Sequence, residues 1–431
     1  MNAGLLFMTF VFVGALIIGI PIAFVLGLVP LLYLIFFRGI PLVAIASRLY
    51  GGIDNYTLLA LPFFILAGNL MNHTGITRDL VNLSRLLVGR VRGALAQVNI
   101  IASVFFAGLT GAAVADTAAL GSILIPAMVE EGYSREYSAA VTCTSSIIGP
   151  IIPPSIIMVI YASVTGESVG ALFMGGFIPG LLIATSLMIL AYYYAVKYNH
   201  PKRTERIETR EAILIIARSM VALFVPVIII GGILTGMFTP TEAAAIACFY
   251  AFLAGIFYYH TLTIKNIVDS LINAGIVSAT ILFIISTCQV FGMVLTLERI
   301  PEHIAQVMTT VVPNKYIFLL IVNVLFFFMG MIMETGASVI LLAPILLPVA
   351  TSFGIHPLHF ALVMLVNLNV GLATPPVGVC LFTVTPIAKV PLERIIPKAM
   401  PFVAAEMVAV LVLTYVPDLV LFLPRLTGFI D

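Results

Sequence analysis

The amino-acid sequence predicts an all-α polytopic membrane protein made of two inverted repeats, each with a re-entrant helical hairpin and a broken helix. Of its 431 residues, 61% are hydrophobic and 9% are charged, whereas about 25% are charged in an ordinary soluble domain. The apolar sequence also repeats itself in the second half of the chain, and small and polar residues interrupt both copies. Irregular backbone at membrane depth is tolerated only against protein or a wet cavity, so these interruptions predict helices that stop inside the membrane.

Two pairs of segments carry the repeat. Phe105–Pro126 resembles Phe326–Pro344 at a shift of 218 positions, and Ser145–Ser155 resembles Asn367–Val377 at a shift of 222 positions. The paired residues are Asp116 and Glu334, Thr117 and Thr335, Gly149 and Gly371, and Pro153-Pro154 and Pro375-Pro376. Interrupted helices at corresponding positions of two halves are typical of the binding site of a secondary transporter.

The first repeat is expected to cover residues 1–196. Its apolar runs are divided by Gly and Pro, which end or kink helices. We therefore expect two spans within Leu5–Phe37, divided at Gly19–Pro21, and a span over Gly51–Met71 that is kinked at Pro62. The other elements are a lateral helix (Ile40–Tyr50), an amphipathic surface helix (Ile76–Arg92), the hairpin (residues 94–129), the broken helix (residues 137–164) and a span (Val169–Tyr194).

A hydrophilic linker over residues 197–211 separates the halves, and the pattern restarts over residues 212–431. The expected elements are paired spans (Ala212–Met237 and Thr241–Tyr259), a second lateral helix (His260–Asn273), a span (Ile276–Leu297), a surface segment (Pro301–Val312), the second hairpin (residues 317–350), the second broken helix (residues 360–386) and a last span (Ala399–Tyr415). Glu242 follows Thr239 and Pro240, a helix start signal, so its carboxylate is expected to cap its own helix.

Basic residues predict the orientation. Ile76–Arg92 and Lys197–Arg210 hold nine of the 20 Lys and Arg residues, which indicates that both segments are cytoplasmic. Counting the spans from there opens the first hairpin to the cytoplasm and the second to the outside, and it puts both termini in the periplasm.

The composition also excludes several classes of function. A net charge of +1 gives no electrostatic basis for binding nucleic acid, and without a phosphate-binding loop the chain does not hydrolyse ATP. The cysteines lie singly in apolar runs, so we expect buried thiols rather than metal ligands or disulfides. They are Cys143, Cys248, Cys288 and Cys380.

Asp116 and Glu334 are the sharpest candidates for function. A carboxylate at mid-membrane depth costs roughly 2.5–3.5 kcal/mol on insertion scales, so each one needs a partner or a role. Either the carboxylate caps a half-helix by accepting hydrogen bonds from free backbone N–H groups, or it contacts an ion or a substrate. Glu406 has no carboxylate at its repeat counterpart, and the sequence does not explain it.

Small and polar residues surround the interruptions. Thr110 and the Gly111–Ala113 run offer a hydroxyl and exposed carbonyls, and unwound carbonyls of this kind coordinate Na⁺ in transporters. Prolines free further carbonyls from helical hydrogen bonding at the two breaks. The residues at the breaks are Gly149, Ile152, Pro154, Gly371, Thr374 and Pro376, and the polar residues just before them are Ser145, Ser146, Asn367 and Asn369. We expect the latter four, with Asp116, Thr117 and Thr335, to bind substrate.

These residues give the chain a resemblance, over essentially its full length, to the large membrane subunit of tripartite ATP-independent periplasmic (TRAP) transporters. The segments that carry it are Gly51–Met71, Gly108–Gly121 with its ADTAALG, GPIIPPS at Gly149–Ser155, GMFTPTEAAA at Gly236–Ala245, and Met333-Glu334. The resemblance implies an elevator-type permease of a Na⁺-driven, binding-protein-dependent importer of organic anions, such as C4-dicarboxylates, sialic acid or related sugar acids. It also implies the bacterial inner membrane, a small four-helix membrane subunit and a periplasmic substrate-binding protein as partners, and no organic cofactor.

The resemblance further implies where Na⁺ binds. A first site is expected at Thr110, Ala112, Gly149, Ile152 and Pro154, with Asp116 close to the substrate. The family often has Ser where this chain has Ala112, so only a backbone carbonyl can serve there. A second site is expected in the other half, at Gly330, Glu334, Gly371, Thr374 and Pro376.

Three other functions remain open from the sequence. One is a self-sufficient Na⁺- or H⁺-coupled transporter of organic anions, and another is a passive channel. The third is an intramembrane enzyme that uses Asp116 and Glu334 as an acid–base dyad. Against the enzyme, the two carboxylates lie on hairpins that are expected to enter from opposite faces.

Overall fold

The computed structural model of the protein describes residues 3–202 and 208–430, and over these residues it is helical, without strands. Eight of the described helices are long and apolar enough to cross a membrane, or nine if a bent pair forms one span. The predicted all-α polytopic class is therefore confirmed. Residues 203–207 of the predicted linker lie outside the described part of the chain, and α11 begins at Thr209.

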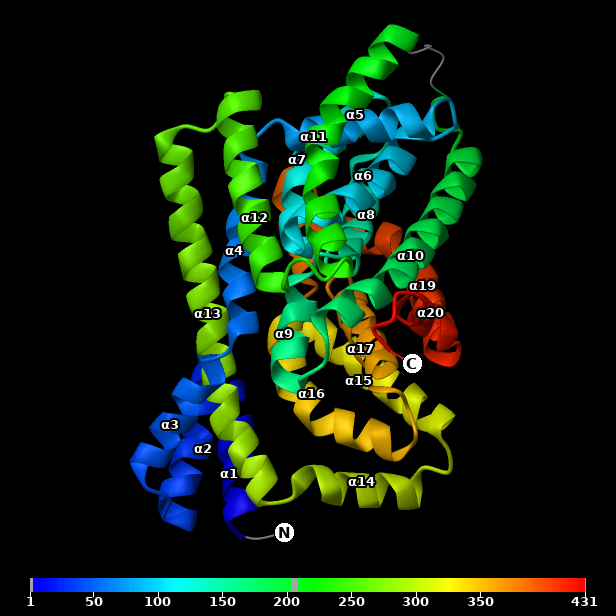
Figure 1. The fold of residues 1–431 in the computed structure, drawn as a ribbon. Helices are drawn as coiled ribbons and strands as arrows, with labels where there is room; N and C mark the ends of the chain where they lie inside the picture. Colours follow the sequence, from blue (N-terminus) through cyan, green and yellow to red (C-terminus); the bar gives the residue numbers. More distant parts are fainter. Residues whose placement is uncertain (1–2, 203–207, 431) are drawn as a thin grey trace.

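The helices follow the predicted order (Figure 1). The first half contains α1 (Ala3–Ile17), α2 (Ile22–Arg38), α3 (Leu42–Ile53), α4 (Ala60–Asn72), α5 (Ile76–Val88), α6 (Ala94–Thr110), α7 (Ala113–Glu130), α8 (Arg135–Ser145), α9 (Ile156–Thr165) and α10 (Val169–Lys197). The second half contains α11 (Thr209–Leu234), α12 (Pro240–Leu253), α13 (Ile264–Leu297), α14 (Ile300–Val311), α15 (Lys315–Ile332), α16 (Thr335–Ser352), α17 (Pro357–Gly371), α18 (Val379–Ala388), α19 (Leu392–Tyr415) and α20 (Asp418–Leu426). Short 3₁₀ turns precede α4 (Tyr56–Leu59) and follow α8 (Ser146–Ile148), and a π turn (Ala254–Tyr258) follows α12.

Both predicted hairpins are pairs of helices with a short interruption. α6 and α7 are separated by Gly111 and Ala112, and α15 and α16 by Met333 and Glu334. Gly111 has a φ of +60°, a conformation that favours glycine, and a side chain there would also meet the Pro154 carbonyl oxygen. In Figure 1 the α6–α7 pair lies toward the same end of the molecule as α5, and the α15–α16 pair lies toward the end that carries α14.

Helix ends correct the register of the repeat. The residue numbers of α7 and α16 differ by 222 at both ends, from Ala113 to Thr335 and from Glu130 to Ser352. This shift equals the one between the two breaks, so one register covers hairpin and break alike. It pairs Glu334 with Ala112 and places Ser338, rather than Glu334, opposite Asp116. The shift of 218 positions predicted for the hairpins is therefore wrong, because it aligned residues that only share an apolar composition. Asp116 and Glu334 are not equivalent positions of the repeat.

Two predicted features of the spans are wrong. The second lateral helix is not separate, because α13 runs unbroken over residues that were divided between a lateral helix and a span. This region has no proline, and its Gly275 has open space around it, so nothing there ends a helix. In the first half, the 54° bend lies between α3 and the Tyr56–Asn72 segment, not at Pro62. Pro62 falls in the first turn of α4, where a missing N–H breaks no helical hydrogen bond.

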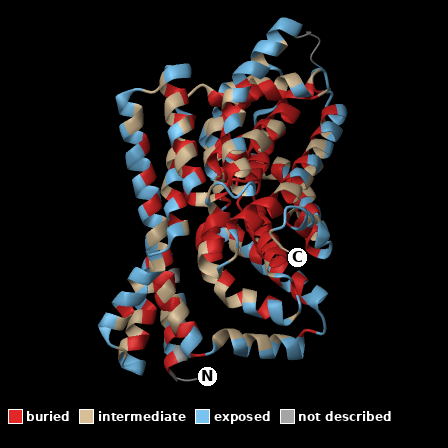
Figure 2. Ribbon diagram, in the orientation of Figure 1, coloured by how far each residue is buried: buried red, intermediate tan, exposed pale blue. Residues whose placement is uncertain are grey.

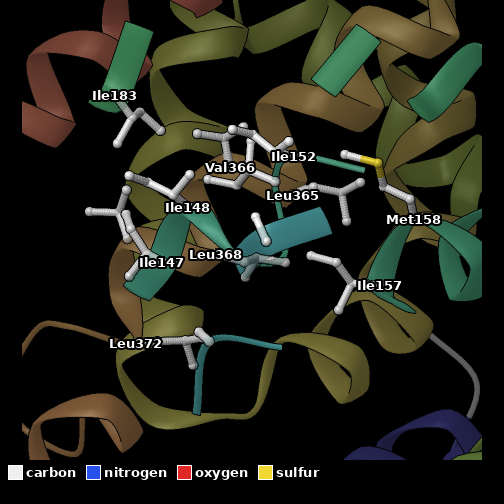
Figure 3. Close-up of a cluster of buried hydrophobic side chains, with 14 of the residues drawn as sticks. Ile147, Ile148, Ile152, Ile157, Met158, Ile183, Leu365, Val366, Leu368 and Leu372 are labelled. Atoms are coloured by element: carbon white, nitrogen blue, oxygen red, sulfur yellow. The ribbon is translucent and has the colours of Figure 1, made fainter. Parts of the chain in front are cut away.

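The two breaks pack against each other in the core. Figure 3 shows side chains that flank the first break, such as Ile148 and Ile152, beside Leu365, Leu368 and Leu372 from the second. All five are buried. Figure 2 shows the buried residues concentrated where these broken segments meet, while the outer faces of α11 and α13 are largely exposed. Exposed apolar residues on helices long enough to span a bilayer are the faces that lipid would cover.

A second group of helices lies to one side of this core. α13 packs against α2, α3 and α4, and α4 packs against α12. In Figure 1 these helices form an upright set beside the hairpins and breaks. At its start, α12 carries the predicted cap: the Thr239 hydroxyl accepts from the Glu242 backbone N–H, and the Glu242 carboxylate accepts from the Thr239 N–H. This prediction is confirmed.

Candidate functional site

A cavity of about 720 Å³ lies where the two hairpin tips meet α13. Both tips contribute to its wall, as do the start of each break and one face of α13. From the first half its lining includes Gly111–Val114, Pro150, Ile156, Ile157 and Ile160. From the second half it includes Ile276, Val277, Thr280, Ile281 and Ile284 of α13, and Met333–Ala337, Asn369, Leu372 and Val379. No Lys or Arg is found among the described residues that line it.

Four helices begin at or beside this cavity: α7, α9, α16 and α18. The first backbone N–H groups of a helix have no partner within the helix, and its N-terminus carries a partial positive charge. α9 is capped by the Ser155 hydroxyl, which accepts from the Met158 N–H, and α16 is capped by Glu334. At the start of α18 the Cys380 N–H donates to the Leu372 carbonyl, whereas α7 has no side-chain cap. The cavity therefore offers an anion the uncapped backbone donors of α7 in place of cationic side chains.

Asp116 lies in the first turn of α7 but does not cap it. Its carboxylate is fully buried and accepts a hydrogen bond from the Thr110 hydroxyl at the end of α6. The second oxygen, Oδ2, has no hydrogen-bond partner among the described residues. A buried carboxylate oxygen without a partner is costly, so this oxygen is available to a cation.

Gly149 makes room for that carboxylate. A Cβ at residue 149 would lie 2.1 Å from Asp116 Oδ2, so only glycine allows the first break to approach α7 this closely. Nearby, the Pro154 carbonyl oxygen faces Gly111, where a Cβ would lie 2.8 Å from it. Hairpin tip and break thus bring a carboxylate oxygen, a hydroxyl and a carbonyl into one region.

The predicted first sodium site stays a prediction, and its five residues lie as follows. Thr110 bonds to Oδ1 of Asp116, Gly149 lies against Oδ2, and the Pro154 carbonyl oxygen faces the adjacent Gly111. Oxygens of this kind are ligands for a hard cation. Ala112 can offer only its carbonyl, which accepts from the Asp116 backbone N–H. Ile152 directs its side chain away toward α10, since a Cβ on Gly180 would lie 2.2 Å from Ile152 Cγ1.

The predicted second site gives no comparable fit. Glu334 caps α16, and its carboxylate accepts from the Ala337 N–H at 3.1 Å. Gly330 and Gly371 are in backbone contact, with a Cβ on Gly371 only 2.4 Å from the Gly330 carbonyl carbon. The Thr374 hydroxyl donates to the Val370 carbonyl of α17, Pro376 is exposed, and none of the five has a buried side-chain oxygen without a partner in the described structure. This site stays a prediction.

The residues predicted to bind substrate fall into two groups. Thr335 and Asn369 line the cavity and bond to each other, with the Thr335 hydroxyl donating to Asn369 Oδ1 at 3.3 Å. The others are buried away from its wall in this conformation. Thr117 and Ser146 donate to carbonyls of their own helices, Ser145 bonds to Ser103, and Asn367 donates to Asn323. The latter two bonds tie each broken helix to the hairpin of its own half.

The sequence analysis missed the glycines of α10 that allow the first break to pack closely against this helix. A Cβ on Gly176 would lie 2.4 Å from the Ile151 carbonyl oxygen, and Gly180 receives the Ile152 side chain one turn later. The two glycines form a small-xxx-small pattern on α10, which marks close helix contact in membranes. That spacing was available as a signal. Sequence reasoning also missed α13 as a cavity wall, because nothing in its apolar sequence distinguishes it.

Comparison with known proteins agrees with this architecture. Residues 9–419 match the family described as "Tripartite ATP-independent periplasmic transporter, DctM component". The chain is 37% identical to the sialic acid TRAP transporter large permease protein SiaM of Vibrio cholerae, over 97% of each chain. It is 38% identical to the C4-dicarboxylate TRAP transporter large permease protein DctM of Pseudomonas aeruginosa, over 94% of each chain. Its fold resembles that of the Alcanivorax borkumensis YdaH transporter, with a TM-score of 0.64, 14% identity, and coverage of 94% of this chain and 97% of that one.

Fold and site thus define a multi-span membrane transporter subunit, not an enzyme. The chain belongs to the DctM family, the large permease component of the TRAP transporters.

Proposed function

We propose that this chain is the large permease subunit of a Na⁺-coupled, binding-protein-dependent importer of organic anions. The observation that carries the proposal is the cavity itself, formed where two interrupted helix pairs meet a continuous helix, α13. Interrupted helices whose N-termini face a mid-membrane cavity are how transporters hold anionic groups without burying a cationic side chain. Sialic acid and C4-dicarboxylates, named for the two relatives, are both carboxylates and belong to the substrate class proposed here.

Na⁺ coupling rests on Asp116. When bound, Na⁺ supplies the positive charge that the unpartnered Oδ2 lacks. Thr110 positions the other carboxylate oxygen, and Gly149 leaves the space into which Oδ2 projects. Because Asp116 lies in the first turn of α7, whose uncapped end faces the cavity, its charge state acts directly on any anion held there.

The transport step we propose is an elevator movement. The hairpins and breaks pack into one buried core, which extends to buried residues of α4 and α12, while α2 and the end of α13 form a second apolar cluster. The helices α2, α3, α4 and α12 pack around α13 and one another beside the hairpins. The core would carry substrate past this set as a rigid unit, with the two halves acting as inverted repeats. The hairpins lie toward opposite ends of the molecule, which supports such an inversion (Figure 1).

The remaining components follow from the family's tripartite description. We propose that a small four-helix membrane subunit covers apolar surface of the α13 group, and that a periplasmic binding protein delivers the substrate. In the bacterial inner membrane, the end of the molecule with the basic helix α5 would face the cytoplasm. The N-terminus lies at the opposite end, beside α14, which supports its periplasmic placement (Figure 1); for the C-terminus the periplasm stays a prediction.

Uptake by proteoliposomes tests the proposal. The chain alone, the chain with its small subunit, and both with the binding protein would each receive an inward Na⁺ gradient and a radiolabelled sialic acid or C4-dicarboxylate. We expect accumulation against the substrate gradient only with all three components and only with Na⁺. Full accumulation by the lone chain would favour a self-sufficient Na⁺- or H⁺-coupled transporter, and flux that never exceeds equilibrium would favour a passive channel.

The acid–base dyad finds no support in the site. Asp116 is buried and bonded to Thr110, while Glu334 is exposed on the cavity wall and bonded to its own helix. Two carboxylates that share a proton must be in contact, and each of these has a different partner.

A further inference from the structure

Glu406 is an acidic residue buried in the core. Glu406 lies in α19, a candidate membrane span, on the face that packs into the core. The other buried residues on that face recur at helical spacing and are apolar, except for a threonine at the end: Ile395, Ala399, Phe402, Val403, Ala409, Val410, Leu413 and Thr414. Glu406 is therefore a carboxyl group in the middle of an apolar stripe, and it is fully buried.

Both carboxyl oxygens of Glu406 lack a hydrogen-bond partner among the described residues. Asp116, the other fully buried carboxylate, differs because one of its oxygens is bonded to Thr110. An ionised carboxylate without partners in an apolar interior is much less favourable than the neutral acid. The geometry therefore requires the neutral form of Glu406 in the conformation described here.

The surroundings do not fit a cation in place of the proton. The titratable groups that act electrostatically with Glu406 are the buried thiols of Cys143 on α8 and Cys380 on α18. Hard cations prefer oxygen ligands, and no hydroxyl or carbonyl is bonded to this carboxyl in the described structure. A proton needs no ligand cage.

The charged and titratable groups on the other neighbours of α19 lie at other levels of the helix. Tyr194 of α10 and Tyr137 of α8 pack on Phe402, one turn before Glu406. His359 of α17 bonds to the Leu413 carbonyl, two turns after it. Cys380 of α18 lies within electrostatic range of both Asp116 of α7 and Glu406.

We propose that Glu406 is a proton-binding site of the core, whose proton is required for the packing of α19 against α8 and α18. The inference about proton binding stands on the fold alone, and its effect on uptake rests on the proposed transport function. At neutral pH the folded chain holds this proton, whereas the unfolded chain releases it above about pH 4.3. The folded state thus binds more protons than the unfolded state, so stability falls as pH rises.

The test compares Glu406→Gln with the wild type and with Glu393→Gln. Glutamine keeps the shape and is permanently neutral, and Glu393 is exposed at the start of the same helix, so its variant is a matched control. Infrared difference spectroscopy of the purified chain would look for the C=O stretch of a buried carboxylic acid at neutral pH. Thermal unfolding and uptake would then be followed from neutral to alkaline pH.

We expect the acid band in the wild type and in Glu393→Gln, and its loss in Glu406→Gln. Raising the pH should lower the melting temperature of the wild type. It should also lower wild-type uptake, by up to about tenfold per pH unit. In Glu406→Gln, melting temperature and uptake should both respond less to pH. An unchanged acid band in Glu406→Gln, or equal pH responses of the melting temperature in all three proteins, would overturn the inference. Because band and melting temperature are measured without substrate, failure of the transport proposal would leave them unaffected.

Discussion

The carboxylate of Asp116 occupies the space where a side chain at Gly149 would lie. A Cβ on Gly149 would come within 2.1 Å of Oδ2 and 2.9 Å of Cγ of Asp116. Gly149 has ordinary helical dihedral angles, with φ −49° and ψ −57°, so its role is close approach and not an unusual backbone conformation. The contact joins the tip of the first hairpin to the first break, and any displacement of one element moves the other.

Gly149→Ala should therefore impair Na⁺-dependent uptake. The added methyl group must push the Asp116 carboxylate away from its present position, and we expect the apparent affinity for Na⁺ to fall at least about tenfold, which corresponds to about 1.4 kcal/mol. Uptake as a function of Na⁺ concentration measures this. Gly231→Ala is the control, because a Cβ on Gly231 in α11 meets nothing within 4 Å. Equal Na⁺ dependence in both variants would place the ion elsewhere.

The variant Asp116→Asn distinguishes an effect on folding stability from an effect on Na⁺ binding. Asparagine has almost the same shape but removes a buried charge that has only one hydrogen-bond partner, so without Na⁺ the variant should be as stable as the wild type or more stable, by about 1–3 kcal/mol. Na⁺ should raise the melting temperature of the wild type and leave that of the variant unchanged, because a ligand stabilises only the state that binds it. Thermal unfolding with Na⁺ and with K⁺ checks this. A full Na⁺ response in Asp116→Asn would contradict the assignment.

Neighbouring glycines on α10 give a matched pair of variants. A Cβ on Gly176 would lie 2.4 Å from the Ile151 carbonyl oxygen, whereas a Cβ on Gly175 would have its nearest contact at 3.4 Å, on Leu362. Overpacking of this kind costs about 1–3 kcal/mol, so Gly176→Ala should lower thermal stability and uptake together. Gly175→Ala should behave like the wild type. If both variants are equally stable, the first break does not depend on its contact with α10.

We expect the main role of Glu334 to be that of N-cap of α16. Glu334→Ala removes the acceptor for the Ala337 N–H, and loss of an N-cap costs about 0.5–2 kcal/mol. We expect a lower melting temperature for Glu334→Ala and partial recovery in Glu334→Asp, which keeps a carboxylate at the start of α16. If alanine leaves the melting temperature unchanged but abolishes uptake, the carboxylate acts on the ion or the substrate instead.

The sequence was sufficient to predict most of the helices and the positions of the two hairpins and two breaks. Apolar run lengths together with Gly and Pro positions place both hairpins and both breaks within a few residues of the observed ends, because these residues act through local backbone geometry. The first sodium site drew on the family resemblance and stays a prediction, although the structure brings Thr110 and Gly149 into contact with Asp116. The helix α20 was missed, since its short sequence lies beyond the last span.

Register and partners could not be obtained from the sequence in the same way. Apolar segments match one another at several shifts, so only the helix ends show that Glu334 pairs with Ala112. Whether a carboxylate caps its own helix or faces another element depends on tertiary contacts: Glu334 does the first, and Asp116 does the second. The part of the cavity wall formed by α13 also depends on tertiary packing between the two halves, so the sequence does not predict it.

Cross-linking α13 to the second hairpin tests the elevator movement. The thiol of Cys288 in α13 lies 3.1 Å from the Ile340 carbonyl oxygen in α16, so the backbone of residue 340 lies next to a native thiol, within reach of a short cross-linker. If the core moves past α13, joining Ile340→Cys to Cys288 with a short bifunctional thiol reagent should abolish uptake, because the two helices could no longer separate. The same treatment of Ile340→Cys in a Cys288→Ser background should leave uptake intact. Undiminished uptake by a protein that is shown to be cross-linked would mean that α13 and the hairpin move together, and the boundary between moving and static parts would have to lie elsewhere.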